Sequence, residues 1–215
     1  MERRGFYKIL ISKNIDLKVA HYIIRLAHVF INKKGSFNVA LAGGKTPLKA
    51  YSILSKLQKD WTKINLFLTD ERYVPVEDER SNCKNLRRFF ESINCFDTSL
   101  PPDKSALIYS QKLQSLGCLD LVLLGVGKDG HTASLFPNAE CKRITKEVCI
   151  STSPDGLIRL SLTEEFINLS EKVVFFIKGE EKREVLKKLL TCEDIPALKI
   201  KPRRSALIFT DLTLL

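Results

Sequence analysis

Residues 120–137 read DLVLLGVGKDGHTASLFP, an apolar run that ends in a glycine-rich loop carrying a histidine. The run 119–124 is the most apolar of the expected strands, and strands that are apolar on both faces are typical of a parallel sheet covered by helices. In such sheets, ligands bind beyond the carboxyl ends of the strands. The stretch therefore predicts an α/β protein with a candidate site where residues 125–131 leave the sheet.

The rest of the chain alternates short apolar runs with amphipathic segments, a pattern that is typical of α/β proteins. The sequences GGKTP and TDER follow two further expected strands, and we expect all three strand ends to converge at one edge of the sheet. We predict a single domain, residues 1–215, with a Rossmann-like three-layer fold, a mostly parallel central sheet and helices on both faces. The expected strands are 6–11, 37–42, 64–69, 119–124, 158–162, 173–178 and 206–209, and the expected helices are 14–34, 47–59, 81–90 and 180–190.

The composition is that of an ordinary globular chain, with 44% hydrophobic and 28% charged residues in 215. The net charge of +10 suits nucleic acid, an anionic membrane or phosphorylated substrates, or only aids solubility. The densest basic group, within residues 199–204, has no interleaved aromatic residues for stacking on bases. The most apolar stretch, 15–31, is interrupted by charges and cannot span a bilayer. We expect neither a nucleic-acid nor a membrane partner.

The cysteines and the N-terminal residues indicate where in the cell the protein is located. The six cysteines include no CxxC pair, which predicts reduced thiols rather than a disulfide framework or a zinc site. The start, MERRGFYKILI, lacks the long apolar core of a signal peptide. We therefore expect a cytoplasmic protein. The cysteines are Cys83, Cys95, Cys118, Cys141, Cys149 and Cys192.

Two glycine-rich segments imitate nucleotide-binding motifs. GGKT at 43–46 lacks the first glycine of a P-loop, because Val39 occupies that position. It remains either a structural turn or a glycine turn whose free N–H groups, at a helix N-terminus, suit a phosphate. Gly125, Gly127 and Gly130 match GxGxxG, but Pro137 leaves no room for the long helix of a dinucleotide site.

His131 is the most informative single residue, because it lies in a glycine-rich loop where a histidine has no evident packing role. Imidazole suits proton transfer near neutral pH, although a lone loop histidine can equally be structural. Asp70 and Arg72, at another strand end, are further candidates, and Arg159 and Lys182 can form an anion clamp. Each of these charges taken alone is also explained as a solvated surface group. A GxSxG elbow and a histidine pair at metal-ligand spacing are both absent from the sequence.

Several long motifs together resemble the 6-phosphogluconolactonases, which share a superfamily with the glucosamine-6-phosphate deaminases. In order, they are LAGGKTPLKAY, LFLTDERYVPVEDERSN, DLVLLGVGKDGHTASLFP, IRLSLT and GEEK. The resemblance covers about residues 37–209. It implies hydrolysis of 6-phosphoglucono-δ-lactone in the oxidative pentose phosphate pathway, with a phosphorylated sugar lactone as partner and neither a metal nor an organic cofactor.

The resemblance also implies roles by position. His131 matches the histidine proposed as general base, and Asp70 and Arg72 line the lactone end. Asp70 also matches the acid that takes a proton from the sugar carbon in the deaminases. The phosphate is held by Gly43, Gly44, Lys45 and Thr46, with added charge from Arg159 and Lys182.

Two features favour a lactonase: Arg72, where deaminases carry tyrosine, and the TASLFP segment. The chain departs from the family at Lys128, where proline is common, in VEDER, which lacks a histidine, and in a short 102–119 segment that suggests a trimmed helix. A deaminase or isomerase and a non-enzymatic phosphosugar-binding module remain alternatives. The module would carry an appended DNA-binding segment, and none is visible. The sequence leaves the oligomeric state open, with a monomer as the expectation.

Overall fold

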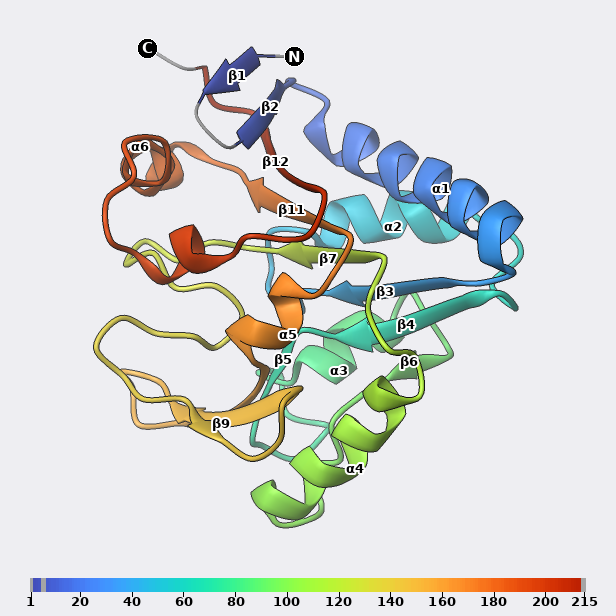
Figure 1. Cartoon of the computed structure of the whole chain (residues 1–215), viewed down its shortest axis with the longest axis vertical. Helices are drawn as coiled ribbons and strands as arrows, with labels where there is room; N and C mark the ends of the chain where they lie inside the picture. Colours follow the sequence, from blue (N-terminus) through green and yellow to red (C-terminus); the bar gives the residue numbers. More distant parts are fainter. Residues whose placement is uncertain (1, 5–6, 214–215) are drawn as a thin grey trace.

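A central parallel sheet organises the computed structural model, which describes residues 2–4 and 7–213 (Figure 1). Within those residues the sheet has eight strands in the order β1-β2-β12-β11-β7-β3-β4-β6, and only β1 runs antiparallel to its neighbour. Residue 6 of the expected strand 6–11 lies outside the described residues. The strands are β1 Glu2–Arg4, β2 Tyr7–Ile11, β3 Phe37–Leu41, β4 Ile64–Leu68, β6 Ile93–Asn94, β7 Leu121–Leu124, β11 Lys172–Ile177 and β12 Ser205–Thr210.

Helices cover both faces of this sheet, which confirms the three-layer prediction. Successive side chains of a strand point to opposite faces. On β4, Leu66 faces the layer formed by the first two helices, whereas Phe67 meets Tyr109 of the fourth helix at 5.9 Å between ring centroids. The helices are α1 Ile15–Lys34, α2 Leu48–Leu57, α3 Asn82–Arg87, α4 Pro102–Gln114, α5 Glu164–Asn168 and α6 Arg183–Leu190, with 3-10 turns at Glu180–Lys182 and Pro196–Lys199.

The direction in which the chain crosses the sheet reverses between β3 and β7. These two strands are parallel neighbours, but the chain leaves β3 towards β4 on one side and leaves β7 towards β11 on the other. Loops that diverge in this way open a binding crevice at the carboxyl ends of the strands. The two glycine-rich segments, 43–46 and 125–131, are the loops that begin there.

A second sheet corrects the expected assignment of residues 158–162. Instead of joining the parallel sheet, β10 (Ile158–Leu162) pairs antiparallel with β5 (Asp70–Arg72) and with β9 (Val148–Thr152), and β8 (Lys142–Arg143) completes this sheet of four strands within the described residues. The alternation of Arg159 and Ser161 with Leu160 and Leu162 in the sequence is typical of an antiparallel strand, and in the structure Ser161 is buried along with the two leucines. TDER is thus more than the end of a strand, because three of its residues form β5.

The expectation of reduced cysteines is wrong. Disulfides join Cys83 to Cys95 and Cys141 to Cys149, with Cα–Cα distances of 5.8 and 5.5 Å. The missing CxxC motif excludes only pairs that are close in sequence. Packing of α3 against β6 brings the first pair together across 12 residues, and the β8–β9 pairing brings the second together across 8.

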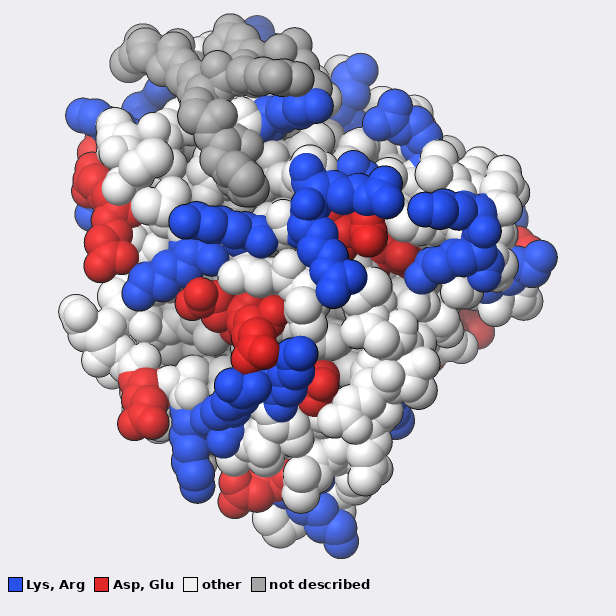
Figure 2. Space-filling view, in the orientation of Figure 1, with Lys and Arg blue, Asp and Glu red and all other residues white. Residues whose placement is uncertain are grey.

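Positive charge is dispersed over the surface. Figure 2 shows basic side chains spread across one face with acidic side chains between them. Several form ion pairs, such as Lys34 with Asp120 at 3.0 Å and Lys178 with Asp16 at 2.7 Å. Within residues 2–4 and 7–213, no helix is both long and apolar enough to cross a membrane.

Candidate active site

A cleft of about 420 Å³ lies where the loop after β7 meets the second sheet. Four of the predicted site residues line it together, so two of the three expected segments, TDER and the loop 125–131, meet here, whereas residues 43–46 do not line the cleft. The loop supplies His131, and β5 and β10 supply the other three. The titratable side chains that line the cleft are Asp70, Arg72, Lys128, Asp129, His131, Asp155 and Arg159.

His131 is oriented by a carboxylate that the sequence analysis missed. Its Nδ1 lies 2.6 Å from Oδ1 of Asp129, and its ring packs against Phe136 at 4.9 Å between centroids. Burial raises the pKa of Asp129, but hydrogen bonds and charge from His131 outweigh burial and lower it overall. A carboxylate on Nδ1 leaves Nε2 as the nitrogen able to take a proton from water.

Gly127 explains why this loop is rich in glycine. A Cβ at Gly127 would lie 2.1 Å from Nδ1 of His131, so any side chain there would displace the imidazole. The loop closes on itself, because the N–H of Gly127 donates to the carbonyl of His131 at 2.8 Å. Gly127 of the GxGxxG match therefore leaves the space that the imidazole of His131 occupies.

Asp70 lies at the base of the cleft and is held by two hydroxyl groups. Thr69 Oγ1 donates to Oδ1 of Asp70 at 2.9 Å, and Ser134 Oγ donates to Oδ2 at 2.8 Å. Only 8% of Asp70 is exposed. Ser134, which belongs to the TASLFP segment, is a second site residue that the sequence analysis did not single out.

Two arginines lie side by side on neighbouring strands of the second sheet. Arg72 and Arg159 are direct cross-strand partners, and like charges in such positions repel. Burial, followed by the charge of Arg72, lowers the pKa of the Arg159 guanidinium. Nε of Arg72 is buried without a hydrogen-bond partner. Arg159 has Asp155 as an ion-pair partner at 4.0 Å, and two guanidinium groups that share one cleft are suited to binding an anion.

The remaining predicted residues are not among those that line the cleft. Gly43 is buried against α3, and Lys45 is exposed. Thr46 is half-buried in the turn before α2. Lys182 Nζ donates to the carbonyl of Val126 at 2.8 Å, and burial and the charge of Lys128 lower its pKa despite the acidic neighbours.

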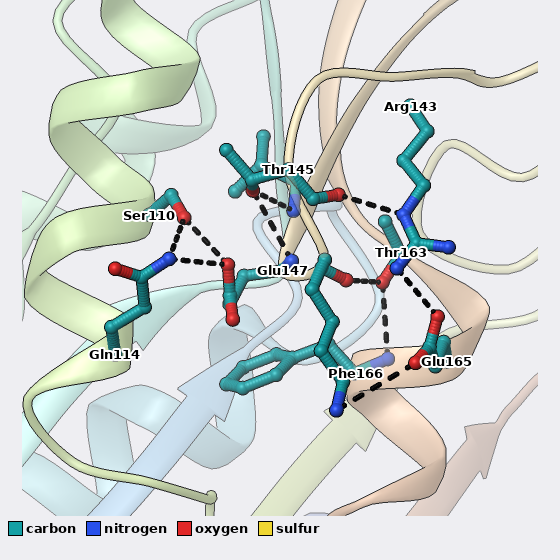
Figure 3. Close-up of polar contacts among 10 residues, drawn as sticks. Ser110, Gln114, Arg143, Thr145, Glu147, Thr163, Glu165 and Phe166 are labelled. Carbon is teal, nitrogen blue, oxygen red and sulfur yellow. Dashed lines mark hydrogen bonds and ion pairs between the residues drawn. The ribbon is translucent and has the colours of Figure 1, made fainter.

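A polar cluster joins the second sheet to α4 and α5 (Figure 3). Glu147, just before β9, accepts hydrogen bonds from Ser110 Oγ at 2.7 Å and Gln114 Nε2 at 3.1 Å, both on α4. Arg143 on β8 pairs with Glu165 of α5 at 2.8 Å. These contacts attach the β8–β9 side of the second sheet to α4 and α5.

Comparison with known proteins gives a consistent result. The family model described as glucosamine-6-phosphate isomerases/6-phosphogluconolactonase matches residues 12–209. A protein of Thermotoga maritima named 6-phosphogluconolactonase is 33% identical over 192 residues, which is 83% of this chain and 86% of that protein. One from Nostoc sp. with the same name is 32% identical, covering 94% and 91%.

Solved structures agree with this result. The crystal structure of 6-phosphogluconolactonase from Thermotoga maritima superimposes with a TM-score of 0.82 at 29% identity, covering 95% of this chain and 98% of that one. A 6-phosphogluconolactonase from Shewanella baltica gives a TM-score of 0.85 at 21% identity, covering 98% and 99%, and shows the common fold.

Proposed function

We propose a mechanism for this chain from the premise that it belongs to the glucosamine-6-phosphate isomerase/6-phosphogluconolactonase family. It is an enzyme that hydrolyses 6-phospho-D-glucono-1,5-lactone to 6-phospho-D-gluconate in the pentose phosphate pathway. The observation that carries the mechanism is the Asp129–His131 pair, which opens onto a cleft with two arginines.

His131 is the general base of this proposal. Its Nε2 takes a proton from water as the water oxygen attacks the lactone carbonyl carbon, and Asp129 stabilises the imidazolium that forms. Arg72 stabilises the negative charge that develops on the carbonyl oxygen. When this intermediate collapses, the ring C–O bond breaks and the imidazolium returns its proton to the leaving oxygen. The base is then restored.

The phosphate is bound away from the reacting carbon. Arg159, Lys182 and the N–H groups and hydroxyl of residues 43–46 are assigned to it, because a guanidinium, an ammonium and a helix N-terminus all favour a dianion. Binding at this end holds the lactone carbon against the attacking water. The cation-rich cleft thus contributes to rate through positioning.

The cytoplasm is the proposed location. Disulfides are rare there, since cellular thiols keep most cysteines reduced, so the state of the Cys83–Cys95 and Cys141–Cys149 pairs in the cell is the observation that decides this location. Alkylating the free thiols of freshly lysed cells and counting the labelled cysteines by mass spectrometry tests it. Six labelled cysteines support a cytoplasmic protein, and two labelled cysteines contradict it.

The reaction is tested by following freshly generated lactone by NMR with and without the protein. The lactone also opens spontaneously, so the rate without protein is subtracted. We expect the protein to accelerate ring opening and to form 6-phosphogluconate as the product. A rate equal to the spontaneous one, with folded protein present, would refute the assignment.

A further inference from the structure

Asn82, the first residue of α3, touches three parts of the site at once. Its Oδ1 accepts a hydrogen bond from Nη1 of Arg72 at 2.5 Å, and its Nδ2 donates to the backbone carbonyl of Asp70 at 2.8 Å. A Cβ on Gly43 would lie 2.2 Å from the Cβ of Asn82, so the phosphate loop packs directly against this side chain. One buried amide therefore links the second sheet to the loop after β3.

The position of Asn82 is itself fixed by Glu71. This carboxylate is 1% exposed and accepts the backbone N–H groups of Arg72, Asn82 and Cys83, each at 2.7 Å. Burial raises its pKa, and the three N–H donors act in the opposite direction. The Cys83–Cys95 disulfide anchors the next residue of α3. Asn82 thus has little freedom to move relative to β5.

The Asn82 amide holds the Arg72 guanidinium without adding a negative charge beside it. Arg159 is the direct cross-strand partner of Arg72, so the two positive charges repel each other at the cleft. A carboxylate in place of Asn82 would hold the guanidinium as an ion pair and offset its charge. A neutral amide oxygen and the carbonyl of Arg80, which accepts from Nη1 at 2.9 Å, hold the same group and leave its full charge for a ligand.

We propose that Asn82 is a positioning residue that fixes the Arg72 guanidinium in the cleft without neutralising it. The inference rests on the proposed function, in which Arg72 stabilises the developing oxyanion. It predicts that Asn82 affects turnover only through Arg72. The observation behind it is that one amide bonds to both ends of β5: it accepts from the Arg72 side chain and donates to the Asp70 carbonyl.

The test is a double-mutant cycle with Asn82→Ala and Arg72→Lys, measured as kcat and KM for lactone opening. We expect Asn82→Ala to lower kcat about tenfold, mostly without raising KM, and to have less than a twofold effect when Arg72 is already lysine. Asn82→Asp, which is nearly isosteric, should also lower kcat because the new carboxylate offsets the arginine charge. Asn85→Ala is the matched control on the same helix, since its amide reaches only the Gly43 carbonyl at 3.5 Å. We expect it to keep wild-type kcat.

Three results would overturn the inference. An equal loss from Asn82→Ala in both backgrounds would show that Asn82 acts on the fold as a whole. Full activity in Asn82→Asp would show that a carboxylate beside Arg72 does not weaken its stabilisation of the oxyanion. If wild type itself fails to accelerate lactone opening, the proposed function fails first and the inference fails with it. Activity in wild type together with additive mutants would refute the inference alone.

Discussion

The eight-stranded sheet and the four-stranded sheet reach the same cleft in different ways. The parallel sheet contributes His131 from a glycine-rich loop, where its side chain is 34% exposed. The antiparallel sheet contributes Arg72 and Arg159 from within paired strands, where register fixes them opposite each other. Proton transfer is thus assigned to the loop 125–131. Binding of the oxyanion and of the phosphate is assigned to the paired strands β5 and β10 of the second sheet, which we call the frame. Changes at His131 of the loop and at Arg72 of the frame should affect turnover, whereas changes at Arg159 should affect binding and changes at the disulfide should affect stability.

Replacing the loop histidine should give the largest effect on turnover. We expect His131→Asn to fold normally and to lose about 10²–10⁴-fold in kcat, which is the usual contribution of a general base. The measurement is lactone opening by NMR with the spontaneous rate subtracted, and circular dichroism checks the fold. A folded variant with near-wild-type kcat would remove His131 as the base and make Asp70 the next candidate.

Replacing Arg159, the frame arginine assigned to the phosphate, should chiefly weaken binding. Arg159→Ala should raise KM about 10–100-fold, because a charged hydrogen bond to an anion contributes roughly 1.5–3 kcal/mol. Lys182→Ala should act in the same direction. Arg143→Ala is a suitable control, since this exposed arginine lies on the same sheet but pairs with Glu165. Unchanged KM in both Arg159→Ala and Lys182→Ala would refute the phosphate assignment.

Opening a disulfide of the frame should affect stability more than turnover. Cys141→Ser together with Cys149→Ser removes a cross-link over 8 residues and should lower the free energy of unfolding by about 2–3 kcal/mol. At 25 °C the variant should keep kcat within about threefold of wild type, because Cys141 and Cys149 lie outside the cleft lining. Urea denaturation of both proteins under oxidising conditions measures the difference. Equal unfolding midpoints would show that the bond contributes nothing to the frame.

Lys128 should give the smallest effect. It is an exposed lysine that lines the cleft, and its positive charge helps to lower the pKa of Lys182. Exposed charges contribute little, so Lys128→Ala should raise KM only about two- to threefold and leave kcat unchanged. A rise in KM as large as that of Arg159→Ala would move Lys128 into the phosphate site.

The sequence predicted the parallel sheet better than the second sheet, for a physical reason. Buried parallel strands are continuous apolar runs, and the helix at 14–34 ends at Gly35, which has the expected left-handed conformation with φ 85°. The three residues of β5 are polar and too short to show a pattern, so only their pairing with β10 reveals a strand. The disulfides likewise depend on contacts that spacing in sequence does not report.

The candidate site was predicted in part. Its charged residues stand out at strand ends, and Asp129 was within reach, because a carboxylate two residues before a loop histidine can fold back onto it. Ser134 and Asn82 carried no such signal. Their roles come from distances to residues 64 and 10 positions away along the chain. A single sequence contains no measure of such distances.

The division between loop and frame is tested most directly by calorimetric titration of 6-phosphogluconate into wild type, His131→Asn and Arg159→Ala. We predict that His131→Asn binds the product within about threefold of the wild-type Kd, whereas Arg159→Ala binds it at least about tenfold more weakly. If His131→Asn lost as much affinity as Arg159→Ala, the histidine would belong to the binding frame, and the separation of chemistry from anion binding would be contradicted.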